Sequence, residues 1–265
     1  MMLITSKDNQ YIRLINELKK KKYREKYGLF LAEGKRLTED LVLSSLTPHL
    51  LLYAEDFDDV AFLEKISLSA DHVFAVSRSL FGKIAETQND QGILAAFPVF
   101  CPEPDSYAPG EHDLMLILNG VSDPGNLGTI VRSAAAAGVS AVLMEEGCVD
   151  LYNPKVIRST MGTIAKIPVF QGLSQEKICG FMKEWKVTVY LADMNEAVSY
   201  EDLSVDDPVA VVLGNEGNGI SENWRETGFP GVMIPMMNGV ESLNVAMAAG
   251  IIAFDHQRKV RKNLK

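Results

Sequence analysis

The sequence predicts an α/β protein of two domains, in which a small N-terminal domain precedes a larger parallel-sheet domain. Short apolar segments alternate with helical patterns along the chain of 265 residues. This alternation is typical of repeated βα units and of a sheet covered by helices on both faces. It is interrupted once, between residues 98 and 113, by four prolines and one glycine. We therefore expect domains at 1–97 and 114–265, joined by a linker at 98–113.

The N-terminal domain is expected to open with a single helix over residues 7–26. Its apolar residues Ile12, Ile15 and Leu18 recur at helical spacing, and a lysine cluster follows them. Short apolar runs and helical patterns then alternate up to residue 97. We expect strands at 27–34, 49–53, 72–77 and 91–97, and helices at 35–45, between 53 and 72, and at 79–86.

The pattern restarts at residue 114 with LMLILNGV, a continuous apolar run of the kind that is buried in a parallel sheet. The segment NLGTIVRSAAAAG is expected to form a helix that ends at Gly138, because glycine is common just after the last helical turn. A second helix is expected at 174–185. The remaining strands are expected at 141–144, 166–170, 187–193, 208–214 and 231–235.

Composition excludes several classes of protein. No apolar run approaches the ~18 residues of a membrane span, and the first ten residues lack the apolar segment of a signal peptide. We therefore expect a cytoplasmic protein. The three cysteines and four histidines are scattered along the chain. Their spacing favours neither a disulfide framework nor a metal site, and no metal is expected.

The charge distribution is uneven. The formal net charge is −9, yet residues 1–27 hold eight basic and three acidic residues, and residues 256–265 hold five basic and no acidic ones. Basic ends on an acidic body are typical of a protein that makes a localised contact with a polyanion such as RNA. A solvated helix face and a frayed C-terminal tail explain the same pattern equally well.

Three strand ends in the second domain carry unusual loops, and ligands of open α/β sheets bind beyond the carboxyl ends of the strands. The first loop contains a tight turn at 123–126 and leads to Arg132 on the next helix. It lacks the GxGxxG spacing of a dinucleotide-binding loop, which argues against a nucleotide-dependent oxidoreductase. The second loop, at 213–221, places three glycines around Glu216, so that the backbone can approach a ligand closely. Taken singly, Arg132 also fits an ordinary surface or salt-bridge arginine, and Glu216 fits a structural or solvated loop glutamate.

A third loop, at 234–244, precedes an alanine-rich helix. Its Asn238–Gly239 pair predicts a turn, since asparagine tolerates left-handed backbone conformations. Ser242 is the expected N-cap of the helix, and Glu241 and Asn244 could satisfy other free amides there. Asn244 is then expected inside the first helical turn, where asparagine is a mediocre helix former. Capping alone therefore explains Asn244 poorly.

Taken in order, SDPGNLGTIVRSAAAAG, VVLGNEGNGIS and IPMMNGVESLNVAMAAGI resemble the three motifs of the SpoU/TrmH family of RNA 2′-O-ribose methyltransferases, in the SPOUT superfamily. NPKVIRSTMGTIAKIPV resembles the family's linking element. KKKKYREKYGLFLAEGKRL and TQNDQGILAAF resemble the small L30e-like domain that often precedes the catalytic one. The resemblance covers nearly the whole chain. Two positions depart from it: Asn238, where glycine is common, and Ala246, where serine is frequent.

The resemblance implies an L30e-like RNA substrate-binding domain at 1–97 and a SPOUT methyltransferase domain at 114–265, whose C-terminal part is threaded into a deep trefoil knot. It implies S-adenosylmethionine as the cofactor, held bent by the knot loops at a homodimer interface. The small residues Ala246, Ala249 and Gly250 would let helices pack closely in that dimer. Core packing within one subunit explains these small residues equally well.

The resemblance also implies roles for individual residues. Arg132 would orient the ribose 2′-hydroxyl and stabilise its charge rather than act as a base, because arginine is not normally deprotonated in proteins. Glu216 would hold Arg132 or a ribose hydroxyl. The implied catalytic set is Asn126, Arg132, Glu216, Ser242 and Asn244. The implied cofactor contacts are Leu213, Gly214, Ile234 and Leu243. The expected RNA contacts are Lys19, Lys20, Lys21, Lys22, Arg24 and Arg158.

The expected function is S-adenosylmethionine-dependent 2′-O-methylation of RNA. Ribosomal RNA, 23S in particular, is the leading substrate, because the L30e-like module binds structured RNA. Two alternatives stay open: transfer RNA as the substrate, and a non-catalytic RNA-binding or ribosome-assembly protein on the same scaffold. A degenerate relative of that second kind is expected to lack Arg132, Glu216 or Asn244, and all three are present.

Overall fold

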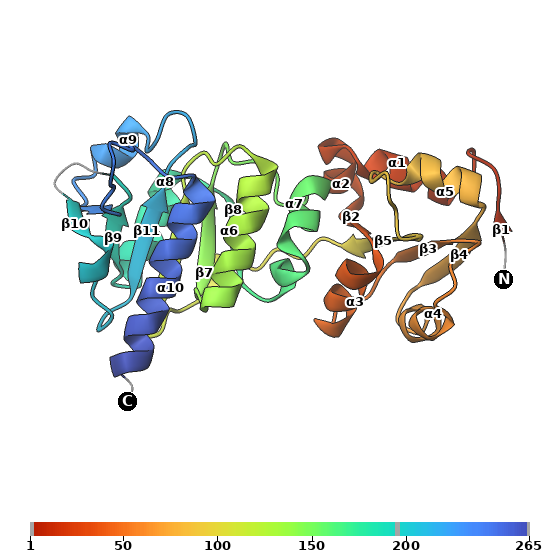
Figure 1. The fold of residues 1–265 in the computed structure, drawn as a ribbon, viewed down its shortest axis with the longest axis horizontal. Helices are drawn as coiled ribbons and strands as arrows, with labels where there is room; N and C mark the ends of the chain where they lie inside the picture. The colour runs from red at the N-terminus through yellow and green to blue at the C-terminus, as the bar shows by residue number, and fades with distance from the viewer. Residues whose placement is uncertain (1–2, 194–196, 264–265) are drawn as a thin grey trace. The chain divides into compact units, whose positions relative to one another are not determined.

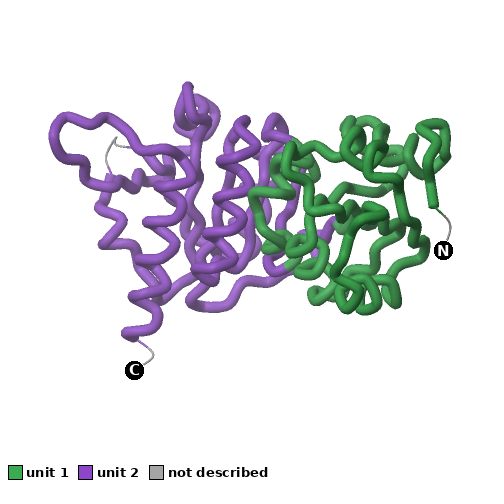
Figure 2. The backbone as a smooth tube through the Cα atoms, turned by 45° about the vertical axis from the view of Figure 1, so that its right-hand side comes forward, with its two compact units in different colours: residues 1–100, 150–165 green, residues 101–149, 166–265 purple. Residues whose placement is uncertain are grey.

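The computed structural model describes residues 3–193 and 197–263. The chain divides into two compact units, the first made of residues 1–100 and 150–165 and the second of residues 101–149 and 166–265 (Figure 2). The segment 150–165 thus groups with the first unit, whereas the limits expected from the sequence assign it to the second domain. Those limits, 1–97, 98–113 and 114–265, stay a prediction.

The first unit is built on a five-stranded mixed sheet (Figure 1). Its strand order is β1 (Leu3–Ile4), β4 (His72–Val76), β3 (Leu50–Ala54), β5 (Ile93–Pro98) and β2 (Leu29–Glu33). Strands β1, β4 and β3 run parallel, and β5 runs antiparallel to both of its neighbours. The four strands expected from the sequence are confirmed. The two-residue strand β1 is too short to leave a periodic signal and was not expected.

The helix expected over residues 7–26 is wrong as a single element. The structure has two helices, α1 (Gln10–Leu18) and α2 (Lys21–Tyr27), and Lys20 between them is extended, with φ −106° and ψ 132°. Leu18 and Arg24 are both buried. In one continuous helix these residues, six positions apart, would point about 120° away from each other. The break lets both side chains face inward.

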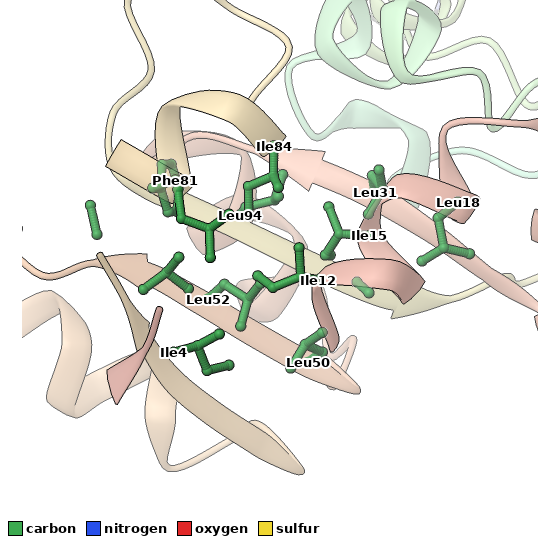
Figure 3. Close-up of a cluster of buried hydrophobic side chains, with 14 of the residues drawn as sticks. Ile4, Ile12, Ile15, Leu18, Leu31, Leu50, Leu52, Phe81, Ile84 and Leu94 are labelled. Carbon is green, nitrogen blue, oxygen red and sulfur yellow. The ribbon is translucent and has the colours of Figure 1, made fainter. Parts of the chain in front are cut away.

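Three other helices of the first unit follow the expected alternation with its strands, and a fourth, over Pro154–Thr160, was not expected. A cluster of buried apolar side chains lies between α1, α5 (Arg78–Ile84) and one face of the sheet, and Figure 3 shows Ile12, Leu52 and Phe81 converging there. The helices are α3 (Lys35–Leu43), α4 (Val60–Ser67), α5 (Arg78–Ile84) and α7 (Pro154–Thr160), with a 3-10 turn at Thr163–Ala165.

The second unit contains a seven-stranded sheet in which every paired strand is parallel, as expected (Figure 1). The central strands β11 (Val209–Leu213) and β6 (Leu114–Leu118) are fully buried, which explains their unbroken apolar sequences. The strand order is β10 (Ala197–Ser199), β12 (Gly231–Met233), β9 (Thr188–Leu191), β11 (Val209–Leu213), β6 (Leu114–Leu118), β7 (Ala141–Glu145) and β8 (Val169–Leu173).

Two helices of the second unit bear on the site. Helix α6 (Pro124–Ala137) ends at Gly138, whose φ of 75° confirms the expected C-terminal glycine. Helix α10 (Val245–Asn263) packs along α6 (Figure 1). The remaining helices are α8 (Gln175–Glu184) and α9 (Glu222–Arg225), with 3-10 turns at Pro104–Ser106 and Tyr200–Asp202.

Parallel pairing brings the carboxyl ends of β6, β11 and β12 to one edge of the sheet, where the three unusual loops begin. This edge is therefore the place for a site. The trefoil knot stays a prediction. Among the helices of the described residues, none is both long enough and apolar enough to cross a membrane.

Candidate active site

The carboxylate of Glu216 is the centre of a hydrogen-bond network at the strand ends. Ser122 donates to it through its backbone N–H over 3.2 Å and through its hydroxyl over 3.1 Å. The backbone N–H of Asp123 donates over 3.1 Å, and the Nδ2 of Asn126 donates over 3.0 Å. The loop after β11 is thereby tied to the loop after β6. Ser122 was not expected in the site, although it directly precedes the Asp-Pro-Gly-Asn turn.

These donors keep Glu216 ionised. Burial alone would raise the pKa of this carboxyl group, but the hydrogen bonds from Asn126 and from backbone amides outweigh it and lower the pKa to about 2. An ionised carboxylate only accepts hydrogen bonds, so Asn126 must present its Nδ2 to Glu216 and keep its Oδ1 for another donor.

Asn244 supplies that donor. Its Nδ2 lies 2.9 Å from the Oδ1 of Asn126. Its own Oδ1 accepts the backbone N–H groups of Ala246 and Met247 over 2.9 and 3.3 Å, which makes Asn244 the N-cap of α10. The expectation that Ser242 caps this helix was therefore wrong, because the helix begins three residues later, at Val245. One side chain caps the helix and joins the third loop to the first.

The loop that carries Glu216 is tightly closed. Asn215 and Gly219 exchange two backbone hydrogen bonds of 2.9 Å, and Gly219 has a φ of 67°. A Cβ atom at Gly214 would lie 2.3 Å from the carbonyl carbon of Gly219. Only glycine fits at residue 214, so this position has a structural requirement alongside its expected contact with a cofactor.

An apolar pocket of about 140 Å³ lies beside this network. Of the expected cofactor residues, Ile234 and Leu243 line it, and the expected catalytic residue Ser242 does too; Leu213 and Gly214 do not. Leu213 is buried at the end of β11. The lining residues are Ala192, Asp193, Val232, Met233, Ile234, Met236, Glu241, Ser242, Leu243, Ala248 and Ile252.

The turn in the third loop has the expected backbone. Asn238 has a φ of 57° and Gly239 a φ of 72°, so asparagine adopts the left-handed conformation where glycine is common in the resembling family. Met237 and Val240, on either side of the turn, are exposed.

Arg132 is exposed on α6, two turns beyond Asn126. Within the described residues its guanidinium forms no hydrogen bond or ion pair, and Glu216 instead binds Ser122, Asp123 and Asn126. The five donors of Arg132 are thus available to a ligand.

The expected RNA-contacting residues all lie in the first unit, in different surroundings. Lys20, Lys21 and Lys22 are exposed and Lys19 is half-buried. Arg24 is buried; it donates to the carbonyl of Leu18 over 2.8 Å and pairs with Asp150. Arg158 donates to Glu86 over 2.8 Å. Arg24 and Arg158 therefore already have partners within the protein.

A parallel α/β unit with an apolar pocket and a polar network at its strand ends defines a cofactor-binding enzyme of the open-sheet class. Similarity to known proteins identifies the family within this class. The chain belongs to the SpoU rRNA Methylase family, whose model matches residues 113–254. An MRM3-like substrate binding domain matches residues 9–95.

Relatives match over nearly the whole chain. The 23S rRNA (guanosine(2553)-2′-O)-methyltransferase RlmP of Bacillus subtilis (strain 168) is 31% identical, over 96% of this chain and 98% of that protein. The mitochondrial rRNA methyltransferase 3 of Homo sapiens is 28% identical, over 96% of this chain and 73% of that protein. The crystal structure of an AdoMet-bound rRNA methyltransferase from Sinorhizobium meliloti superposes with a TM-score of 0.89 at 26% identity, covering 98% of each chain.

Proposed function

We propose that this chain transfers a methyl group from S-adenosylmethionine to a ribose 2′-hydroxyl of ribosomal RNA, with 23S rRNA as the substrate. The observation that carries the proposal is the line of hydrogen bonds from Glu216 through Asn126 to Asn244, which joins all three loops beside the apolar pocket. The relatives include a 23S rRNA 2′-O-methyltransferase, which supports the choice of RNA.

The lining of the pocket suits the nucleoside part of S-adenosylmethionine. Its apolar walls, Ile234 and Leu243 among them, match a nucleoside ring, and Ser242 offers a hydroxyl for hydrogen bonding. The carboxylate of Glu241 belongs to the same lining and complements the positive charge of a sulfonium, whereas that of Asp193, also in the lining, is paired with Arg225 over 3.0 Å. The cofactor supplies a methyl group on that sulfonium, and the protein's task is to hold the 2′-oxygen in line with it.

Arg132 is the residue we assign to the nucleophile. A ribose 2′-hydroxyl is a weak acid and must give up its proton, to water or to an RNA phosphate oxygen, as it attacks. Negative charge develops on its oxygen as the O–H bond breaks, and it is consumed as the new C–O bond forms and the S–CH3 bond of the sulfonium breaks. The unpaired guanidinium can hold an RNA phosphate and this oxygen together and stabilise that charge. The network of Glu216, Asn126 and Asn244 fixes the start of α6, the helix that carries Arg132.

RNA binding by the first unit is assigned to an exposed face of α2. Lys20, Lys21 and Lys22 supply positive charge, and within the described residues their one ion pair is a long contact of 3.8 Å between Lys21 and Glu25. Tyr23 and Tyr27 stack in the same helix, with ring centroids 6.2 Å apart, and can receive unpaired bases. Arg24 contributes by holding α2 in place rather than by touching RNA.

A homodimer is proposed from exposed apolar side chains on α10 and on the loop before it. The exposed fractions are 58% for Met247, 50% for Phe254 and 77% for Met237. Met247 and Phe254 are seven residues apart on α10 and so share one face of the helix, and an exposed apolar face of this kind marks an interaction surface. The small residues have a separate role: Ala246 and Ala249 are buried within the chain, and Gly250 approaches Ser133 of α6. We further propose a cytoplasmic location, where ribosomal RNA is available to such an enzyme.

One experiment separates the proposal from its alternatives. Purified protein is incubated with S-adenosylmethionine carrying a labelled methyl group and, in parallel, with 23S rRNA, 16S rRNA or transfer RNA. We expect label in 23S rRNA at a ribose, mapped as one 2′-O-methyl nucleotide. Label only in transfer RNA would replace the substrate, whereas RNA binding without any label, or no binding of the cofactor by calorimetry, would favour the non-catalytic protein.

A further inference from the structure

We infer that Asn119 and Glu145 are positioning residues that hold the base of the Glu216 loop in its working geometry. Neither residue touches Glu216 or lines the apolar pocket. The inference rests on the methyl transfer proposed above, because it assigns these residues a part in that reaction.

Asn119 follows β6 and is buried, with 8% of its surface exposed. Its backbone N–H donates to the carbonyl of Leu213 over 2.9 Å, at the point where the Glu216 loop begins. Its Oδ1 accepts the backbone N–H of Ser221 over 2.8 Å, at the point where that loop ends. One residue therefore binds both ends of the loop.

Glu145, the last residue of β7, fixes the side chain of Asn119. Its Oε2 accepts the Nδ2 of Asn119, and the Nε1 of Trp224 donates to the same oxygen over 3.0 Å. Trp224 is completely buried on α9, the short helix that follows Ser221. The carboxylate thus ties together the ends of two strands and the helix beyond the loop.

This arrangement determines which way the Asn119 amide points. Because the Glu145 carboxylate accepts and the Ser221 N–H donates, only one orientation of the amide satisfies both. A buried amide that loses one partner leaves a polar group unsatisfied, which is costly in a protein interior. The loop between residues 214 and 220 has its own internal hydrogen bonds, so a shift at its base moves Glu216 as part of a closed unit.

The test compares Asn119→Ala, Glu145→Ala and the double variant. If the two residues act as one relay, each single change lowers kcat for methyl transfer by about tenfold or more, and the double change costs little beyond either single one. The KM for S-adenosylmethionine is expected to stay within about twofold, because the relay does not line the pocket. Glu145→Gln keeps an oxygen acceptor for Asn119 and Trp224 and should retain most of the activity. Asn223→Ala, an exposed asparagine on α9, is the matched control.

A second readout does not depend on activity. Hydrogen exchange of the amides at 214–221 should speed up in Asn119→Ala and Glu145→Ala and stay at the native rate in Glu145→Gln and Asn223→Ala. Wild-type protein that methylates no RNA would overturn the proposed function and leave this comparison intact. Unchanged exchange, additive losses in the double variant, or a Glu145→Gln variant as impaired as Glu145→Ala would overturn the relay. Should Glu145→Ala not fold, Trp224→Phe, which removes only the indole N–H as a donor, takes its place under the same criteria.

Discussion

Asn126 and Asn244, 118 residues apart in the chain, join their side-chain amides over 2.9 Å. Asn126 belongs to the first turn of α6, and Asn244 is the residue before α10. The bond links the starts of two helices that pack along each other. Because Asn126 also donates to Glu216, two direct hydrogen bonds connect the start of α10 to the carboxylate.

The two roles of Asn244 can be separated by Asn244→Asp. Aspartate is an equally good N-cap and adds a favourable negative charge at the helix start, so the melting temperature should change by no more than a few degrees. It cannot donate to Asn126, however, and kcat for methyl transfer should fall by about tenfold or more. Asn244→Ala, which loses both roles, should lower stability by about 1 kcal/mol as well.

Thermal unfolding and methyl-transfer assays on the same preparations check this prediction. Ser242→Ala serves as the comparison for capping, since Ser242 does not cap α10 in the structure. A fully active Asn244→Asp variant would show that the bond between the two asparagines is incidental to the reaction.

Arg132→Ala is expected to lower methyl transfer by roughly 10²-fold or more, because it removes the group that stabilises the nucleophile. Cofactor affinity and melting temperature should stay unchanged, since within the described residues Arg132 has no internal partner to lose. Calorimetry with S-adenosylmethionine and an activity assay measure the two quantities. Arg261→Ala, at the exposed end of α10, is the matched control. Undiminished activity in Arg132→Ala would remove this residue from the mechanism.

The sequence alone predicts most elements of the fold, because β6 and β11 carry unbroken apolar runs and α6 ends at a glycine. It does not predict the break between α1 and α2. That break depends on Arg24 reaching Asp150, a contact between residues 126 apart in the chain. Local helical periodicity contains no information about such a partner.

The sequence predicts the residues of the site only in part. Asn126, Glu216 and Asn244 were named from the motifs, and the structure brings them together. The sequence predicts Ser242 as the N-cap of α10, which is wrong. Serine and asparagine are both good N-caps, and only the position where α10 begins decides between Ser242 and Asn244. Asn119 and Glu145 leave no local signal, because each depends on a partner from another strand end.

His256 on α10 should make stability depend on pH. It is buried, its Nε2 has no hydrogen-bond partner within the described chain, and burial together with the nearby Lys259 lowers its pKa to about 4, against the opposing influence of Asp113 and Asp255. The unfolded chain therefore binds a proton below about pH 6.5 that the folded chain takes up only near pH 4. The contribution of neutral His256 to the free energy of unfolding is complete above pH 7. It is lost as the pH falls from about 6.5 toward 4, by about 2 kcal/mol at pH 5.

His256→Leu should flatten this dependence between pH 7 and pH 5, as measured by denaturant unfolding at several pH values. His72→Leu, an exposed histidine of the first unit, controls for the general effect of losing an imidazole. Equal pH slopes for wild type and His256→Leu would contradict the assignment.

The lysines at the start of α2, with Lys20 just before the helix, can be tested through the salt dependence of RNA binding. Each lysine that neutralises a phosphate releases counterions, so replacing Lys20, Lys21 and Lys22 with glutamine should weaken binding and make the slope of log K against log salt shallower by roughly 2. Their side chains are exposed, so folding should be unaffected. The matched control replaces three exposed lysines of the second unit, Lys177, Lys183 and Lys186, and removes the same charge. An equal loss of slope in both triple variants would mean that net charge alone governs binding, whereas a loss confined to the α2 variant places the RNA backbone on that helix.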